Sequence, residues 1–160
     1  MKRSAGMLMY RRREGALEVL LVHPGGPFFR NKDDGAWSVP KGEYEDEEPL
    51  ACALREFQEE TGLTCAGPYL SLGEIKQKGG KRVQAWAFDG GALEVDCTRP
   101  PPSNTFELEW PPRSGKRATF PEVDKLGLFS LEQAARKILP AQAELLQRLQ
   151  SALDSDQNAP

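Results

Sequence analysis

Three glutamates are spaced so that a helix would gather them into one charged surface. Glu56, Glu59 and Glu60 stand at positions i, i+3 and i+4, so on a helix their carboxylates share an arc of roughly 100°. Carboxylates this close repel one another, and few cations share the arc. Mg²⁺ is a hard ion that takes carboxylate oxygens as ligands. The spacing therefore predicts that a divalent cation completes this surface.

The other side of the same segment is apolar. Its residues recur at the i, i+3, i+4, i+7 and i+11 positions of a helix packed on a core, and they are Leu50, Ala53, Leu54, Phe57 and Thr61. Pro49 falls in the first turn, where its missing N–H costs nothing, and Gly62 follows the last turn, where a left-handed residue closes a helix. These signals predict a helix over residues 48–61.

Residues 55–63, REFQEETGL, match a known motif at every defined position. They resemble the second half of the Nudix hydrolase signature, G-x5-E-x7-R-E-U-x-E-E-x-G-U, in which U is aliphatic or aromatic. The first half departs from the signature, because Glu47 follows Gly42 after four residues in place of five but keeps the seven-residue spacing to Arg55. Glu48 would restore the first gap and shorten the second. We prefer Glu47, because shortening a loop disturbs less than shifting a helix by about 100°.

The resemblance implies a fold, an ion and its ligands. The fold is α+β, an α/β/α sandwich with a mixed sheet between helices, and the ion is Mg²⁺, with Mn²⁺ as a substitute. The implied catalytic and metal-binding residues are Glu56, Glu59 and Glu60. A backbone carbonyl of the turn at Lys41 and Gly42 joins them as a ligand. Glu122, on a loop before the last strand, is where this sequence matches a further acidic ligand.

The resemblance also gives roles to residues around the glutamates. In the Pro-Lys-Gly form, Lys41 would lie near the phosphates, and a solvated loop lysine is the alternative. Arg55 would pair with Glu47 and fix the loop over the helix. Gly42 and Gly62 would be structural.

Length and composition favour one globular domain. The chain has 160 residues, 39% hydrophobic and 28% charged, which suits a sizeable core. We expect a single domain over residues 1–153 and a disordered tail over 154–160. No apolar run reaches the length of a membrane span, and arginines 11–13 interrupt the N-terminal segment, so we expect a cytoplasmic protein. The three cysteines lack C-x-x-C spacing and are expected to be reduced thiols.

The remaining chain reads as strands followed by helices. Residues 5–12 and 17–23 suggest a hairpin, and residues 37–40 a short strand that feeds the Lys41–Gly42 turn. Further predicted strands cover residues 69–75, 83–88, 105–110 and 126–129. Helices are predicted to begin at Leu131, after a capping box of Ser130 and Gln133, and at Pro140.

Aromatic and basic residues outside the helix suit a nucleotide. Phe28 and Phe29 lie in a Gly/Pro loop, where they either stack on a base or cap the edge of the core. Trp110 and Arg113 either hold a base and a phosphate or pack as core. The net charge is −3, so a phosphate site needs bound metal or a local basic patch. A turn that either draws phosphate or solubilises an exposed tip contains Lys76, Lys78, Lys81 and Arg82.

These residues together indicate metal-assisted hydrolysis. Metal ions on the glutamates would bridge diphosphate oxygens and lower the pKa of a bound water, and a glutamate held off the metal would take its proton. The single histidine, His23, offers no Ser-His or Cys-His nucleophile and is expected to be structural. The resemblance implies hydrolysis of a nucleoside diphosphate linked to another moiety, and we favour a (di)nucleoside polyphosphate.

Other substrates and one other class stay open. They are oxidised nucleoside triphosphates, sugar nucleotides, inositol pyrophosphates, RNA caps, and a non-catalytic Nudix module that binds a nucleotide or a partner. Such a module would be expected to have lost glutamates that this chain keeps. The expected partner is a small-molecule nucleotide, without specific nucleic-acid binding or membrane association, and the expected state is a monomer or homodimer.

Overall fold

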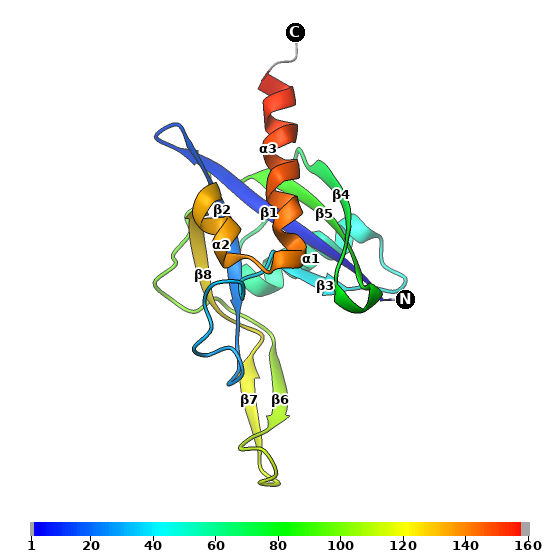
Figure 1. Cartoon of the computed structure of the whole chain (residues 1–160), viewed down its shortest axis with the longest axis vertical. Coiled ribbons are helices and arrows are strands. Elements are labelled where there is room, and N and C mark those ends of the chain that lie inside the picture. The colour runs from blue at the N-terminus through cyan, green and yellow to red at the C-terminus, as the bar shows by residue number, and fades with distance from the viewer. Residues whose placement is uncertain (1, 158–160) are drawn as a thin grey trace.

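A six-stranded mixed sheet forms the centre of the molecule (Figure 1). The computed structural model describes residues 2–157. The strands of this sheet are β1 (Arg3–Arg13), β2 (Ala16–Pro24), β3 (Lys41–Glu43), β4 (Leu70–Lys76), β5 (Arg82–Asp89) and β8 (Val123–Ser130). Their order is β4-β5-β1-β2-β8, with β3 paired to β1. β1 runs parallel to β5 and antiparallel to β2 and β3, so the sheet is mixed.

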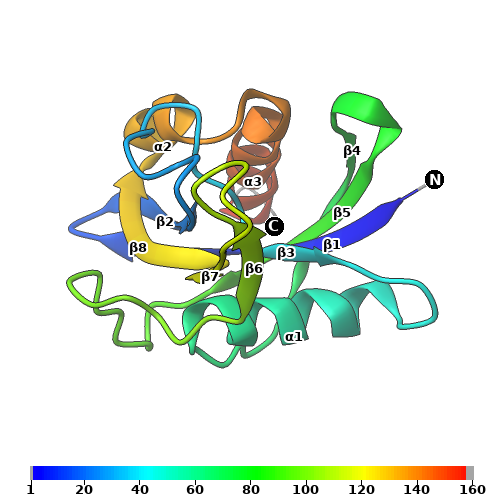
Figure 2. The ribbon, with the colours of Figure 1, turned by 90° about the horizontal axis from the view of Figure 1, so that it is seen from below.

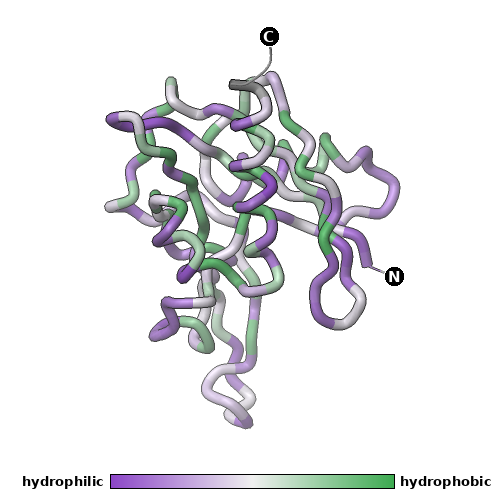
Figure 3. The backbone as a smooth tube through the Cα atoms, turned by 45° about the horizontal axis from the view of Figure 1, so that its top comes forward, coloured by the Kyte–Doolittle hydropathy of each residue, from purple (hydrophilic) through white to green (hydrophobic). Residues whose placement is uncertain are grey.

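Helices cover both faces of this sheet (Figure 2). One face carries α1 (Pro49–Thr61), and the other carries α2 (Leu131–Lys137) and α3 (Ala143–Gln157). Side chains alternate along a strand, so Met7 of β1 packs in one core with Phe57 of α1, while Leu8 packs in the other with Leu145 of α3. Figure 3 shows hydrophobic runs along the strands and hydrophilic residues at the β4–β5 tip. The predicted α/β/α sandwich is confirmed.

The acidic helix lies where the sequence predicts it. Pro49 occupies the first turn of α1, and Gly62 closes the helix at φ 77° while its N–H donates to the carbonyl of Gln58. Phe57 is fully buried and meets Phe88 of β5 edge-on at 5.2 Å between ring centroids. The apolar face thus docks the helix against the sheet and leaves the glutamates on the other side.

The prediction for residues 37–42 is wrong in its details. Trp37 and Ser38 form only isolated bridges, to Ile138 and Val22. The expected turn at Lys41 and Gly42 is instead extended backbone, because strand β3 pairs there with residues 4–6 of β1. A ladder partner thus overrides the local turn preference of glycine.

A second, two-stranded sheet projects from the body (Figure 1). It is a hairpin of β6 (Thr105–Glu109) and β7 (Arg117–Pro121), with Phe106 opposite Phe120. The strand at residues 105–110 was predicted, but β7 was not, because the basic and proline residues around it read as loop. Residues 126–129 belong to the longer strand β8.

The C-terminal helices differ from the prediction only at their ends. The capping box of Ser130 and Gln133 opens α2 as predicted. Pro140 starts a 3₁₀ turn, Pro140–Gln142, before α3. Residues 154–157, which the expected tail includes, belong to α3, and residues 158–160 lie outside the described residues. None of the helices within residues 2–157 is long and apolar enough to cross a bilayer.

Candidate active site

Glu56 lies directly against the backbone of Gly42. A Cβ added to Gly42 would stand 2.1 Å from Cδ of Glu56 and 2.2 Å from its Oε1. Glycine therefore leaves room for the carboxylate here, and any larger residue would require the end of the Glu56 side chain to move. Burial raises the pKa of Glu56, with smaller contributions from Glu59 and Glu122, while Arg55 opposes the shift.

Glu60 is the most deeply buried carboxylate of the group. Burial, followed by the charge of Glu56, raises its pKa to about 9, while a hydrogen bond from the Lys41 backbone opposes the shift. Its Oε2 is buried and has no hydrogen-bond partner within residues 2–157. An unpaired buried carboxylate oxygen is costly, so this position suits a cation.

The pairing of β3 decides which backbone groups face Glu60. The Met7 N–H donates to the Pro40 carbonyl at 3.0 Å, and the Tyr44 N–H donates to the Arg3 carbonyl at 3.1 Å. Because hydrogen-bonded pairs alternate in an antiparallel ladder, the carbonyl of Gly42 is used by β1, and the peptide groups of Lys41 point away from β1. Of the two residues predicted to offer a carbonyl to a metal, Lys41 is therefore the one whose carbonyl is not used in pairing with β1.

Arg55 gathers three carboxylates around one guanidinium. Its Nε and Nη2 donate to Glu47 at 3.0 and 2.8 Å, and its Nη1 donates to Glu56 at 3.0 Å and to Glu59 at 3.2 Å. Hydrogen bonding to Arg55 lowers the pKa of Glu47. The bidentate pair ties the loop before α1 to the helix, and Glu47 rather than Glu48 is the partner in this structure.

Two residues distant in sequence complete the acidic side. Glu122 lies between β7 and β8, close enough for its charge to raise the pKa of both Glu56 and Glu60. Asn104, just before β6, donates from its side-chain amide to Glu59 at 3.2 Å. Asn104 was not predicted, since an asparagine in a Gly/Pro-rich connection carries no signal of its own.

One lysine of β3 lies beside the carboxylates. Burial lowers the pKa of Lys41, an effect that the charge of Glu60 opposes and that of Lys81 reinforces. Lys41 therefore lies near Glu60, and Lys81 lies near Lys41. Arg82, by contrast, donates to Glu74 at 2.8 Å, so it is held on the β4–β5 hairpin.

The predicted aromatic contacts lie away from the carboxylates. Phe28 is 59% exposed and meets Trp110 edge-on at 5.6 Å between ring centroids. Phe29 lies under the Lys32 ammonium at 5.4 Å, and Arg113 is exposed at the turn between β6 and β7 with φ 61°. Strand β6 separates Trp110 from Asn104, and the six steps between them at about 3.4 Å each amount to roughly 20 Å.

The donor set fits a hard divalent cation. In this conformation no group of three or more His, Cys, Asp or Glu side chains within residues 2–157 is arranged to hold a metal ion, because Arg55 draws Glu56 and Glu59 to itself. The oxygens of Glu56, Glu59 and Glu60 are nevertheless the type that Mg²⁺ prefers, and the orphaned Oε2 of Glu60 needs a charge partner.

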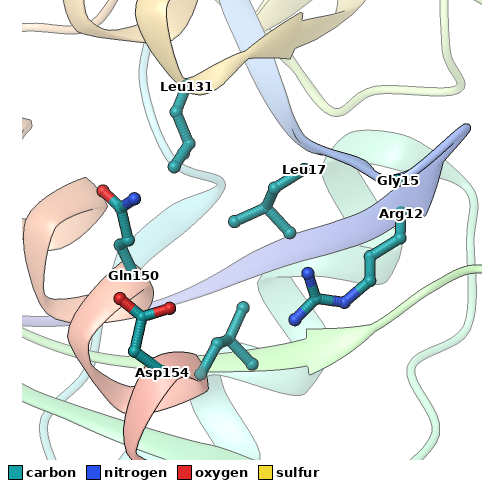
Figure 4. Close-up of a pocket in the computed structure, with 7 residues that line it drawn as sticks. Arg12, Gly15, Leu17, Leu131, Gln150 and Asp154 are labelled. Carbon is teal, nitrogen blue, oxygen red and sulfur yellow. The ribbon is translucent and has the colours of Figure 1, made fainter. Parts of the chain in front are cut away.

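Two other features take no part in this site. His23 is buried, with Nδ1 at 2.7 Å from Asp124 and Nε2 at 2.6 Å from the Lys32 carbonyl, so it holds the loop after β2 in place. A hollow of about 290 Å³ between the β1–β2 hairpin and α3 (Figure 4) lies far from the projecting β6–β7 hairpin. Its lining residues are Arg12, Gly15, Leu17, Leu131, Gln150, Leu153 and Asp154.

Comparison with known families decides the classification. A model of the NUDIX domain matches residues 1–149 of this chain. The chain belongs to the Nudix family. The acidic face of α1, with Gly42 opposite Glu56, is thus the part of this Nudix domain that contains the signature residues.

Curated relatives match parts of this Nudix chain. The mRNA-decapping protein g5R of African swine fever virus is 62% identical over 29 residues, which are 18% of this chain and 12% of that protein. An RNA pyrophosphohydrolase of Brucella anthropi is 32% identical, over 49% of this chain and 59% of that protein. The matched segments thus span less than two thirds of either relative.

Solved structures share the Nudix fold over nearly the whole chain. An Ap4A hydrolase of C. elegans superposes with a TM-score of 0.64 at 22% identity, covering 97% of this chain and 99% of that chain. The NUDIX domain of Shewanella oneidensis NrtR, crystallised with ADP ribose, gives 0.64 at 15% identity, covering 94% and 87%. At these identities the likeness establishes the common fold.

Proposed function

We propose that this protein is a Mg²⁺-dependent hydrolase that cleaves a pyrophosphate linkage in a nucleoside diphosphate joined to another moiety. The observation that carries the proposal is the buried carboxylate of Glu60, unpaired at Oε2 and flanked by Glu56, within reach of the charge of Glu122. Family membership supports it, since Nudix hydrolases generally use divalent metal ions. Mn²⁺ is expected to substitute.

The residues of the site divide the work between binding and proton transfer. When bound, Mg²⁺ supplies positive charge that draws and polarises the phosphate oxygens. Glu56, Glu59 and Glu60 would hold it, with the carbonyl of Lys41 and with Glu122 as further donors. Lys41 places positive charge near the same carboxylates, and Lys81 lies near Lys41, where a polyphosphate would lie. A glutamate of the cluster that is not engaged with the ion accepts the proton of the attacking water.

The favoured substrate is a (di)nucleoside polyphosphate. The β6–β7 hairpin, which carries Trp110 and Arg113, begins next to Asn104, and Asn104 donates to Glu59. The part of the substrate beyond the cleaved linkage could therefore contact this hairpin. The 5′ end of an RNA is a second candidate, and the RNA pyrophosphohydrolase and mRNA-decapping relatives favour it.

Product analysis tests the proposal. The protein is incubated with Mg²⁺ and a panel of dinucleoside polyphosphates, nucleoside triphosphates and 5′-triphosphorylated RNA, and the products are separated by chromatography. Glu59→Gln and Glu60→Gln are expected to slow turnover by about 10²-fold or more. Glu45→Gln, an exposed residue of the loop before α1, is the matched control.

Two results would count against the proposal. If neither variant slows product release, the site assignment is wrong. If the wild-type protein turns over no member of the panel, a Nudix module that binds a nucleotide or partner without hydrolysis becomes the better explanation.

A further inference from the structure

A hollow of about 280 Å³ opens between the β4–β5 tip and the start of the 3₁₀ turn before α3. Its walls are mostly apolar, and the residues that line it are Gln77, Lys78, Leu139, Pro140 and Ala141. Figure 2 shows the β4–β5 tip and this turn facing one another across a gap beside β3. Gln77 is the uncharged polar residue that lines the hollow, and its side chain accepts a hydrogen bond from Gln142.

Gln142 is a glutamine with no exposed surface. The backbone N–H of Val39 donates to its Oε1 at 2.9 Å. Because an N–H can only donate, this bond decides which end of the Gln142 amide is oxygen. Its Nε2 therefore faces the other way and donates to Ser38 Oγ at 3.0 Å and to Gln77 Oε1 at 3.3 Å.

The orientation of Gln142 in turn orients Gln77. Its oxygen accepts from Gln142, so its NH₂ group is the end left over, and this group has no hydrogen-bond partner within residues 2–157. A buried Gln142 that orients the half-buried Gln77 leaves one amide donor free on the wall of an apolar hollow. This is a recognition arrangement, since ligand sites combine apolar walls with a few oriented polar groups.

The hollow is connected to Lys41 along two paths. The Gln77 N–H donates to the Lys81 carbonyl at 2.7 Å, and the charge of Lys81 acts on Lys41. Val39, whose N–H fixes Gln142, is two residues before Lys41. A ligand in the hollow would therefore lie on the Lys41 and Lys81 side of the molecule.

We propose that this hollow binds the nucleobase of the substrate and that the Gln77 side-chain amide reads its hydrogen-bonding edge. Leu139 and Pro140 would contact the planar face of the base. Glutamine is a residue that pairs with base edges through its amide. Gln142 acts as a positioning residue, because it touches Gln77 and not the base. This assignment rests on the proposed function, and it names the group that selects the substrate.

Two substitutions at Gln77 separate recognition from support. Gln77→Leu removes the amide, and Gln77→Glu replaces the free donor by an acceptor. Gln147→Leu, on an exposed position of α3, is the matched control. Gln77→Leu is expected to raise KM for nucleoside polyphosphates about tenfold with kcat nearly unchanged. Gln77→Glu is expected to shift the ranking of the four bases towards those with an amino group.

Inorganic tripolyphosphate provides a competitor without a base. Its inhibition constant is expected to be the same for wild type and both Gln77 variants, because it fills only the phosphate positions. Equal losses for tripolyphosphate and nucleotides, or an unchanged ranking of bases in both variants, would overturn the proposal.

Side-chain amide NMR tests the hollow without turnover. Addition of a nucleoside triphosphate to the ¹⁵N-labelled protein is expected to shift the Gln77 NH₂ resonances and not those of Gln147. If the wild type is inactive but this shift occurs, the hydrolase proposal fails and the base site stands. If turnover occurs without the shift, the base site is wrong.

Discussion

Glu56 and Gly42 show how one missing methyl group shapes the site. The carboxylate of Glu56 occupies the space that any side chain at position 42 would fill. The φ angle of Gly42 is not positive, so a left-handed backbone is not the reason for glycine at this position. Close approach, and not conformational freedom, is therefore the reason for glycine here.

Gly42→Ala is expected to displace the Glu56 carboxylate. The added Cβ would lie 2.1 Å from Cδ of Glu56, so the end of this flexible side chain must move, while the free energy of unfolding should change by less than about 1 kcal/mol. Mg²⁺-dependent turnover should fall. Denaturant unfolding and initial rates measure both quantities, with Gly91→Ala as the control, because its Cβ would approach only Asp89, at 3.1 Å from Oδ1. A fully active Gly42→Ala protein would contradict the prediction.

Glu60 links folding to pH and to metal. Its pKa is raised from 4.5 to about 9, mainly by burial, so the folded state favours the protonated form. The contribution of Glu60 to the free energy of unfolding is therefore fully present below about pH 4.5 and is lost as the pH rises through about 9. Without divalent cations, Tm is expected to fall between pH 6 and pH 9, and Glu60→Gln should flatten this slope.

Added Mg²⁺ should oppose that loss. A cation binds the deprotonated carboxylate, so it stabilises the folded state most where Glu60 is ionised. Thermal melts in chelator and in Mg²⁺, from pH 6 to pH 9, give both comparisons. An identical pH slope for wild type and Glu60→Gln would show that another group controls the stability.

At the scale of elements, α1 is tied to the preceding loop by a single arginine. Arg55 pairs bidentately with Glu47 and also contacts Glu56 and Glu59. Glu48 stands at the N-terminus of α1 without a side-chain capping bond. The loop therefore depends on Glu47, although it is one residue shorter than the Nudix signature.

Glu47→Gln is expected to reduce turnover about 10-fold or more, as loss of a residue that orients metal-binding groups does. The neighbouring Glu48→Gln should stay near wild type and is the natural control. Initial rates at saturating Mg²⁺ and the apparent Mg²⁺ affinity separate loop loosening from loss of a ligand. A larger effect for Glu48→Gln would mean that the other alignment of the signature holds in solution.

At the scale of the whole molecule, the β6–β7 hairpin and the loop after β2 form one projecting lobe. Phe28 meets Trp110 edge-on, and Phe106 lies so close to Gly26 that a Cβ there would be 2.9 Å from its ring. The root of the lobe touches the active site through Asn104 and Glu59. We expect the lobe to contact the far part of long substrates.

Trp110→Ala and Arg113→Ala are therefore expected to discriminate by substrate length. KM for a dinucleoside polyphosphate should rise about tenfold on loss of a stacked base, while KM for a nucleoside triphosphate should change little. Arg99→Ala, an exposed arginine of the connection before β6, controls for loss of charge. Equal effects on the KM of both substrates would show that these residues support the fold and do not bind the far part of the substrate.

The sequence by itself determined α1 and its chemistry. Helical spacing, the Pro49 start and the Gly62 stop are local signals, and they placed Glu56, Glu59 and Glu60 on one face before any contact was known. The strand pattern and the motif together were enough for the α/β/α sandwich. These features depend on residues within a few turns of each other, so periodicity reveals them.

Only the tertiary structure decided what surrounds the carboxylates. Asn104 meets Glu59 from 45 residues away, and Gln142 meets Gln77 from 65. The extended backbone at Lys41 exists because β1 supplies a ladder partner, and β7 because β6 lies beside it. Such pairings are set by the packing of distant segments, and no local pattern encodes them. The candidate site residues lie in one helix, whereas the residues proposed to select a substrate come from distant segments of the chain.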